Sequence, residues 1–281
     1  MKRNYRMKHD FKNKTVIITG ASAGVGAASA RTFANLGANL VLVARGQVAL
    51  DKITEELQAI TSVINIAMDI NDPIANEALL VKAADAFTSI DVLVNNAGFH
   101  QRGDVEKNQA TDLARMVDVN LRAPIQLSTL ILPYLRQAGG GAIVNVGSLA
   151  GRTPLQGAAT YAATKAGLRA FTYSLADELK GSDIYIGVVS PGPIDTGFIM
   201  SEIDQVEDIV FSQPMSSAQQ VADAIISVAR GEAIEISLPR ASGWLTTVSY
   251  LLPALRRALR PALYRKGRKA KQQYKQRNTQ R

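Results

Sequence analysis

Hydrophobic and polar positions follow two alternating patterns along the chain. Short apolar runs rich in Val and Ile, such as "TVIITG" and "GAIVNVGS", predict buried strands. Segments with apolar residues at helical spacing, such as "GVGAASARTFANLG", predict helices. The predicted strands, some with their following turn, span 15–20, 38–45, 62–68, 91–98, 141–148, 184–192 and 233–239. The predicted helices span 24–37, a segment ending near 60, 73–88, 111–137, 158–180 and 217–231.

This alternation predicts an α/β fold, a doubly wound parallel sheet of about seven strands with helices on both faces. The chain has no internal repeat beyond the alternation and no linker before about residue 240. We therefore expect residues 1–240 to form one domain and residues 241–281 a tail. Ligands of such sheets bind beyond the carboxyl ends of the strands, so candidate chemistry is sought there.

Composition narrows the function classes. The 281 residues include no Cys, which excludes disulfides and thiolate metal sites and fits a reducing compartment, so we expect the cytoplasm. His9 and His100 are the two histidines and lie far apart, so no metal site is expected. The basic start "MKRNYRMKHDFKNK" precedes an apolar run that glycines interrupt, so we expect no secretory signal.

Charge is concentrated at the C-terminus. Residues 240–281 hold 12 Lys/Arg and no acid, which leaves 20 basic and 24 acidic residues in the rest of the chain. Arginines 256, 257 and 260 interrupt the apolar half of the tail too early for a membrane-spanning helix. The tail fits an interfacial helix on anionic lipid, a contact with a partner subunit, or nucleic acid. We favour the membrane surface and consider nucleic acid the weakest of the three.

Two predicted strand ends carry cofactor chemistry. "TGASAGVG" places Gly20, Gly24 and Gly26 between the first strand and the first helix, where a backbone turn can bind a pyrophosphate. The spacing G-x-x-x-G-x-G differs from G-x-G-x-x-G. The second strand ends at Arg45, and an arginine there accommodates the 2′-phosphate of NADP(H). Ser22 in the glycine turn is expected to help hold that phosphate.

The later strand ends carry further candidates. Asp69 follows the third strand and is placed to accept a hydrogen bond from an adenine amino group, although such residues also build ordinary turns. "NNAG" (95–98) follows the fourth strand, and its amides can brace neighbouring loops. Ser148 ends the fifth strand. Asn120 lies inside a predicted helix, where asparagine is unfavourable, so we expect a kink, a bound water or a buried partner there.

"YAATK" places Tyr161 and Lys165 on one face of a helix. A nearby ammonium favours the phenolate and lowers a tyrosine pKa by roughly 1–3 units. That change brings the phenol towards the range useful for proton transfer near neutral pH. A solvated Tyr and Lys on a helix surface is the ordinary alternative for the pentapeptide alone.

"TGASAGVG", "NNAG", Asn120, Ser148, "YAATK" and "SPGPIDT", in this order and spacing, resemble the short-chain dehydrogenase/reductase family over about residues 12–240. The resemblance implies a Rossmann-type sheet and an NADP(H)-dependent oxidoreductase, since an Arg after a non-acidic residue at the end of strand two accompanies NADP preference. It also implies catalysis by Asn120, Ser148, Tyr161 and Lys165, with Tyr161 as acid/base and Lys165 lowering its pKa. The cofactor-binding residues it implies are Gly20, Ser22, Gly24, Val25, Gly26, Arg45, Asp69, Asn95, Ala97, Gly98, Tyr161, Lys165, Pro191, Gly192 and Thr196.

The expected reaction is hydride transfer between NADP(H) and a small-molecule ketone or secondary alcohol, in a homo-oligomeric enzyme. In the family, the segment after "PG", here residues 197–215, closes over the substrate. Its apolar residues (Phe198, Ile199, Met200, Ile209, Val210 and Phe211) suggest an apolar, lipid-, acyl- or steroid-like substrate, or helix faces that pack on the body. A non-catalytic NADP(H)-binding sensor or scaffold is the alternative function.

Overall fold

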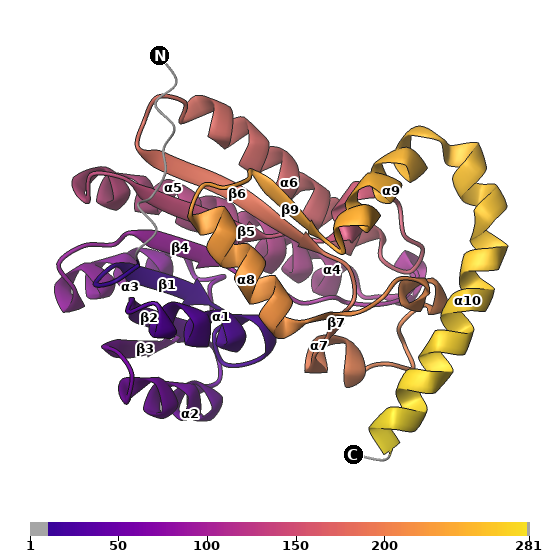
Figure 1. Cartoon of the computed structure of the whole chain (residues 1–281), viewed down its shortest axis with the longest axis horizontal. Coiled ribbons are helices and arrows are strands. Elements are labelled where there is room, and N and C mark those ends of the chain that lie inside the picture. The colour runs from indigo at the N-terminus through magenta and orange to yellow at the C-terminus, as the bar shows by residue number, and fades with distance from the viewer. Residues whose placement is uncertain (1–10, 280–281) are drawn as a thin grey trace.

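A parallel sheet of seven strands forms the centre of the molecule, in the order β3-β2-β1-β4-β5-β6-β9 (Figure 1). The computed structural model describes residues 11–279 and the side chains of residues 11–276, so the basic start with His9 and the last two residues lie outside the described residues. The strands are β1 (Thr15–Thr19), β2 (Asn39–Ala44), β3 (Val63–Ala67), β4 (Val92–Asn95), β5 (Gly141–Val146), β6 (Ile184–Pro191) and β9 (Glu235–Leu238). Short strands β7 (Ile194–Asp195) and β8 (Ser216–Ser217) pair separately. The predicted fold class is confirmed.

The strand order places the functional edge. The chain begins at the centre with β1, moves to one edge through β2 and β3, and returns to pair β4 with β1. The carboxyl ends of β1 and β4 therefore lie side by side at the point where the strand order reverses, which is the usual ligand crevice of such sheets. The glycine turn and the "NNAG" segment meet at this point.

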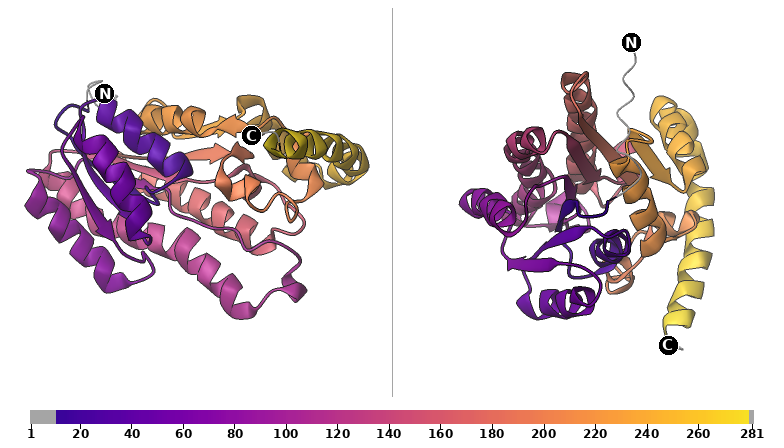
Figure 2. Two further views of the ribbon diagram at one scale, coloured as in Figure 1. Left: turned by 90° about the horizontal axis from the view of Figure 1, so that it is seen from below. Right: turned by 60° about the vertical axis from the view of Figure 1, so that its left-hand side comes forward.

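Helices cover both faces of the sheet (Figure 2). One face is covered by α1 (Gly24–Asn35), α2 (Gln47–Gln58) and α8 (Ala218–Ala229), and the other by α3 (Pro73–Ala86), α5 (Ala123–Gln137) and α6 (Ala159–Glu178). In β1, Val16 and Ile18 face the first core while Ile17 faces the second. Burial on both faces explains why the central strands are continuous apolar runs rather than alternating ones.

The helix predicted over 111–137 is divided. It consists of α4 (Ala110–Val117), a π-helical turn η2 (Asp118–Arg122) and α5. Asn120 is fully buried in that turn. Its Oδ1 accepts from the backbone N–H of Phe99 at 3.0 Å, and its Nδ2 donates to the Phe99 carbonyl at 2.8 Å. The widened turn thus directs a polar side chain inward, where the Phe99 backbone satisfies it.

The C-terminal segment folds back onto the body. After β9 come α9 (Arg240–Leu251) and α10 (Pro253–Thr279), and α10 runs along one side of the molecule (Figure 1, yellow). α9 packs against β9 and the 3-10 turn η3 (Leu149–Arg152), while α10 packs against the 3-10 turn η4 (Asp208–Ser212), just beyond the short helix α7 (Gly197–Met200). Another 3-10 turn, η1 (Val105–Lys107), precedes α4. Among the described helices, none is long and apolar enough to cross a membrane.

Candidate active site

The three glycines of the turn after β1 are required by their backbone conformation or by close contacts. Gly20 and Gly24 have positive φ angles of 66° and 54°, and a Cβ at Gly26 would overlap the Gly20 carbonyl and the Asn96 amide. Asn96 Nδ2 donates to the carbonyls of Thr19 at 2.9 Å and Gly20 at 3.1 Å and so fixes the turn. A compact backbone that opens the N-terminus of α1 is the cradle that a pyrophosphate requires, so these residues fit a dinucleotide.

Other predicted cofactor residues border this cradle. A Cβ on Gly24 would lie 3.6 Å from Thr196 Cγ2, so the loop after β6 faces the glycine turn. Pro191 ends β6, and the Gly192 N–H donates to the Leu238 carbonyl at 2.7 Å, which holds that loop to β9. The backbone N–H of Ala97 donates to the Thr19 hydroxyl at 3.0 Å, and Val25 is buried in the first turn of α1.

The ends of β2 and β3 hold the remaining cofactor candidates. Arg45 is exposed and makes no hydrogen bond or ion pair with the rest of the described chain. Ser22 is half-buried and lies near the end of β2, because the N–H of the preceding Ala21 donates to the Val43 carbonyl at 3.1 Å. Asp69 accepts from the Asn71 N–H at 3.0 Å and is partly exposed. The Asn95 side chain turns inward instead.

The inward position of Asn95 gives it a bracing role. Its Nδ2 donates to Asn145 Oδ1 at 2.9 Å and to Ser128 Oγ at 3.1 Å, which joins β4, β5 and α5 in a buried polar cluster. Asn145 donates onward to the Thr172 hydroxyl of α6 at 2.9 Å. The side chain predicted to contact cofactor therefore holds the strand ends in register.

The four predicted catalytic residues converge beyond β4 and β5. Tyr161 and Lys165 lie one turn apart on α6, with the Lys165 Nζ 5.9 Å from the centre of the Tyr161 ring. The Ser148 hydroxyl lies close enough to Tyr161 to favour its phenolate, and Lys165 donates to the Val146 carbonyl at 2.8 Å. Gly98 links Asn120 to this group: a Cβ there would lie 3.0 Å from Asn120 Oδ1 and 3.6 Å from Lys165 Nζ.

Burial dominates the proton affinities of this group. It raises the pKa of Tyr161, and the Ser148 hydrogen bond and the positive charge of Arg102 only partly oppose it. Burial also lowers the pKa of Lys165 to about 8. The direction for Tyr161 differs from the lowering predicted from the sequence, because removal of water penalises the phenolate more than its neighbours favour it. In the protein alone, Tyr161 keeps its proton at neutral pH and is ready to donate it.

His100 and Arg102 are site residues that sequence reasoning missed. The His100 ring stacks on the Tyr161 ring with centres 4.2 Å apart and planes 16° apart. Burial, followed by the charge of Arg102, lowers the pKa of His100 to about 3, so the imidazole is neutral. Its Nδ1 lies 2.9 Å from Arg102 Nη1, which assigns the ring proton to Nε2 because Arg102 can only donate. Their position two to four residues after "NNAG" is the signal that could have found them.

Arg102 also contacts residues 197–215, here called the lid. It donates to the Phe198 carbonyl at 2.7 Å and pairs with Glu202 at 3.0 Å. Of the apolar lid residues, Phe198 is 43% exposed, whereas Ile199 and Phe211 are buried in a small cluster within the lid and against α10. For Ile199 and Phe211, the apolar character therefore reflects packing of the lid and not an apolar substrate pocket.

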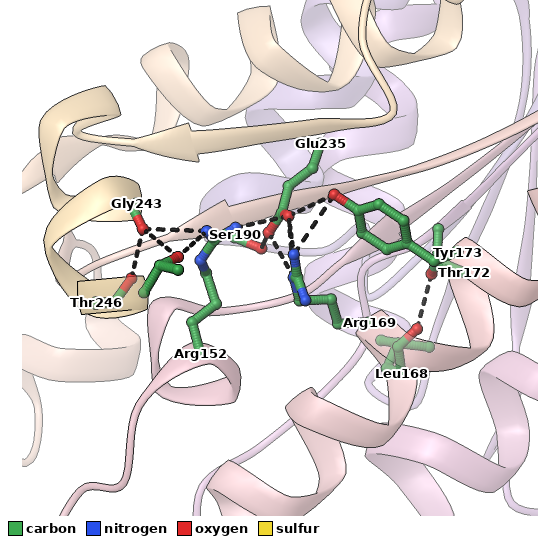
Figure 3. Close-up of polar contacts among 10 residues, drawn as sticks. Arg152, Leu168, Arg169, Thr172, Tyr173, Ser190, Glu235, Gly243 and Thr246 are labelled. Atoms are coloured by element: carbon green, nitrogen blue, oxygen red, sulfur yellow. Dashed lines mark hydrogen bonds and ion pairs between the residues drawn. The ribbon is translucent and has the colours of Figure 1, made fainter. Parts of the chain in front are cut away.

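A buried carboxylate at the start of β9 organises the loop after Ser148 (Figure 3). Glu235 accepts from Arg152 at 2.6 Å and Arg169 at 2.8 Å. Tyr173 and Ser190 donate to it at 2.9 and 2.7 Å. Burial alone would raise the pKa of Glu235, but these hydrogen bonds together lower it to about 2.

Arg152 extends this network into α9. It lies in η3, four residues after Ser148, and donates to the Gly243 carbonyl at 3.1 Å (Figure 3). It also donates to the Thr247 hydroxyl at 2.7 Å. The network therefore joins η3, α6, β6, β9 and α9 beside the four predicted catalytic residues.

Comparisons with known proteins agree with this geometry. Residues 14–208 match the short chain dehydrogenase family. The chain is 32% identical to 3-oxoacyl-(acyl-carrier-protein) reductase FabG of Escherichia coli over 81% of its length and 94% of the relative's. It is 36% identical to sulfoacetaldehyde reductase 2 of Chromohalobacter salexigens over 66% of its length and 74% of the relative's. A short-chain type dehydrogenase/reductase from Mycobacterium marinum has the same fold, with a TM-score of 0.75 at 24% identity over 82% of this chain and 95% of that one. With the family match spanning more than half of the sequence and its motifs gathered at one edge of the sheet, the chain belongs to the short-chain dehydrogenase/reductase family of oxidoreductases.

Proposed function

We propose that the protein is an NADP(H)-dependent oxidoreductase that interconverts a ketone and a secondary alcohol. The observation that carries the proposal is the convergence of Asn120, Ser148, Tyr161 and Lys165 beside a backbone cradle that fits a dinucleotide. Retention of all four residue types at one edge of the sheet favours turnover over a sensor or scaffold.

Proton transfer is the task of this chain's own residues. NADPH, when bound, supplies a hydride to the carbonyl carbon. Ser148 donates a hydrogen bond to the carbonyl oxygen, and Tyr161 gives its proton to that oxygen as negative charge develops. The raised pKa of Tyr161 keeps this proton available. Lys165, whose Nζ lies 5.9 Å from the centre of the Tyr161 ring, is the proposed source of the replacement proton, with Asn120 beside it across Gly98.

The preference for NADP(H) rests on Arg45. It stands at the end of β2, exposed and without a partner in the described part of the chain, next to the glycine turn. No carboxylate occupies the strand end, where an acid would bind a ribose 2′-hydroxyl and repel a 2′-phosphate. A free guanidinium at this position suits bidentate recognition of a phosphate.

The proposed substrate is a ketone with an apolar body. Support comes from Phe198 at the start of the lid, whose ring is partly exposed. The Arg102 guanidinium lies 5.6 Å from the centre of that ring. The names of the relatives point to substrates of different polarity, a 3-oxoacyl-(acyl-carrier-protein) and sulfoacetaldehyde. The test is NADPH oxidation against a panel of acyl, steroid, aliphatic and sulfonated carbonyl compounds. Tight NADPH binding with no turnover on the whole panel would favour a sensor instead.

We also propose that α9 and the first half of α10 bind an anionic membrane surface. Large apolar side chains are exposed along this segment: Trp244, Leu245, Tyr250, Leu251, Leu252, Leu255, Leu259 and Leu263. Arg257 and Arg260 are exposed among them. An exposed apolar stripe edged by cations is the composition that interfacial helices present to acidic lipid. Homo-oligomer formation remains a proposal that light scattering can test.

A further inference from the structure

The second half of α10 presents one face to the lid. Tyr264, Gly267, Lys271 and Tyr274 recur at intervals of three or four residues. Together with Ala270 and Lys275 they are the less exposed positions of this stretch, while Lys266 and Lys269 face solvent. Gly267 is buried, and a Cβ there would overlap the backbone carbonyl of Asp208. The helix and η4 therefore touch through their backbones, an approach that only glycine permits.

Opposite charges meet across this contact. Arg268 pairs with Asp208 at 3.0 Å, and Lys275 pairs with Asp204. Lys271 donates to the Val206 carbonyl at 2.7 Å and lies 3.5 Å from Asp208. In addition, the Tyr264 hydroxyl donates to Glu207 at 3.2 Å. Three of the four acidic residues of the lid thus face the helix, and basic residues of the tail form ion pairs with the lid of the same chain.

An apolar cluster seals the same contact. Phe211, Ile199 and Val206 of the lid are buried together, and Ala270 and Tyr274 of α10 pack against them. The rings of Phe211 and Tyr274 lie 6.0 Å apart. Burial of this kind holds the lid independently of salt, whereas the ion pairs set the register of the helix.

The far side of the lid reaches the catalytic group. Glu202, its fourth acid, pairs with Arg102, which in turn holds His100 against Tyr161. Glu207 lies against Gly157, in the loop before α6, where a Cβ would be 3.4 Å from the Glu207 Cγ. The lid is consequently held between α10 and the residues beside the reacting atoms.

We infer that α10 is a positioning helix for the substrate lid: its Gly267–Tyr274 face fixes residues 197–215 over the site and thereby sets substrate affinity. The helix lies beyond residues 14–208, which match the family, so the family match does not account for it. The main contacts of the described part of α10 are with η4 and α9, so we expect the NADPH affinity to be independent of this helix. The effect on substrate affinity rests on the proposed function, whereas the effect on lid mobility does not.

Two disruptive variants, the conservative variant Lys271→Arg and a matched control test the inference. Lys271→Ala removes a cation that holds the lid, and Lys269→Ala removes the same charge from the solvent face. Gly267→Ala favours an isolated helix by its higher propensity but blocks backbone contact with η4. Amide hydrogen exchange of the full chain, followed by mass spectrometry, measures lid mobility without any substrate.

We expect Lys271→Ala and Gly267→Ala to speed exchange of peptides within 197–215 by at least about fivefold. Lys269→Ala should exchange like the parent. Lys271→Arg should largely retain the slow exchange of the parent, since charged hydrogen bonds are among the stronger ones. With the best ketone of the panel, KM should rise by a similar factor while kcat and the NADPH Kd stay within about twofold. Unchanged exchange in both variants, or faster exchange throughout the chain, would overturn the inference. An unchanged KM despite a mobile lid would overturn its role in substrate affinity.

Discussion

Replacement of Glu235 by Gln tests the buried network beside the Ser148 loop. The side chain is 6% exposed and accepts from two arginines, Tyr173 and Ser190. Its pKa falls from 4.5 to about 2 on folding. At 1.36 kcal/mol per unit, the carboxylate contributes about 3 kcal/mol to the free energy of unfolding at pH 7. Because the folded pKa is depressed, this contribution is present above about pH 4.5 and is lost as the pH falls towards 2.

The assay is urea unfolding of parent and Glu235→Gln at pH 7 and pH 3.5, followed by circular dichroism. The same two pKa values give a difference of about 3 kcal/mol at pH 7 and about 2 kcal/mol at pH 3.5, while other carboxylates cancel between parent and variant. Glu56→Gln is the control, because its partner Arg31 is 46% exposed. An exposed pair of this kind contributes at most about 1 kcal/mol. If Glu235→Gln cost no more than the control, or the same at both pH values, the account of the network would be wrong.

Three further predictions concern the cofactor, the chemistry and the tail. Tyr161→Phe keeps the ring but removes the proton donor, so kcat should fall by at least about 10²-fold with NADPH binding retained; parent-like turnover would remove the phenol from the mechanism. Arg45→Asp should weaken NADPH by roughly one to two powers of ten and NADH much less, measured by fluorescence titration, since charged hydrogen bonds contribute about 1.5–3 kcal/mol. Equal losses would make Arg45 structural. Combined Ser substitutions at Trp244, Leu251 and Leu255 should abolish co-sedimentation with anionic vesicles, while the parent binds them and not neutral ones. A parent that stays in the supernatant would refute membrane binding.

Matched controls exist for the two site variants. Tyr134→Phe and Arg136→Asp change the same residue types on α5, towards its C-terminal end and away from the carboxyl edge of the sheet. We expect turnover and the affinity for both nicotinamide cofactors to stay close to those of the parent in these controls. A loss as large as in Tyr161→Phe or Arg45→Asp would show a general effect on the fold.

The sequence by itself determined the fold class and the edge of the sheet at which the candidate site lies. Strand and helix periods depend on neighbouring residues, and parallel strands bring their carboxyl ends to one edge. Any residue placed just after a strand, such as Gly20, Gly98 or Ser148, therefore had to reach that edge. The Tyr161–Lys165 pair depends only on the spacing within one helix.

Tertiary structure alone decided how these groups are tuned and covered. Burial sets the direction of the Tyr161 pKa, and desolvation has no signature in local spacing. A π-helical turn directs the Asn120 side chain inward, where it bonds with Phe99, 21 residues earlier in the chain. Glu235 forms its ion pair with Arg169, which is 66 residues away in the sequence. The sequence predicted that the basic tail contacts lipid or a partner, yet the second half of the tail binds the acidic lid of the same chain. One of these contacts joins Tyr264 to Glu207, which are 57 residues apart in the sequence. Charge composition shows that the tail is basic, and only the folded chain shows which carboxylates lie within hydrogen-bond distance of its cations.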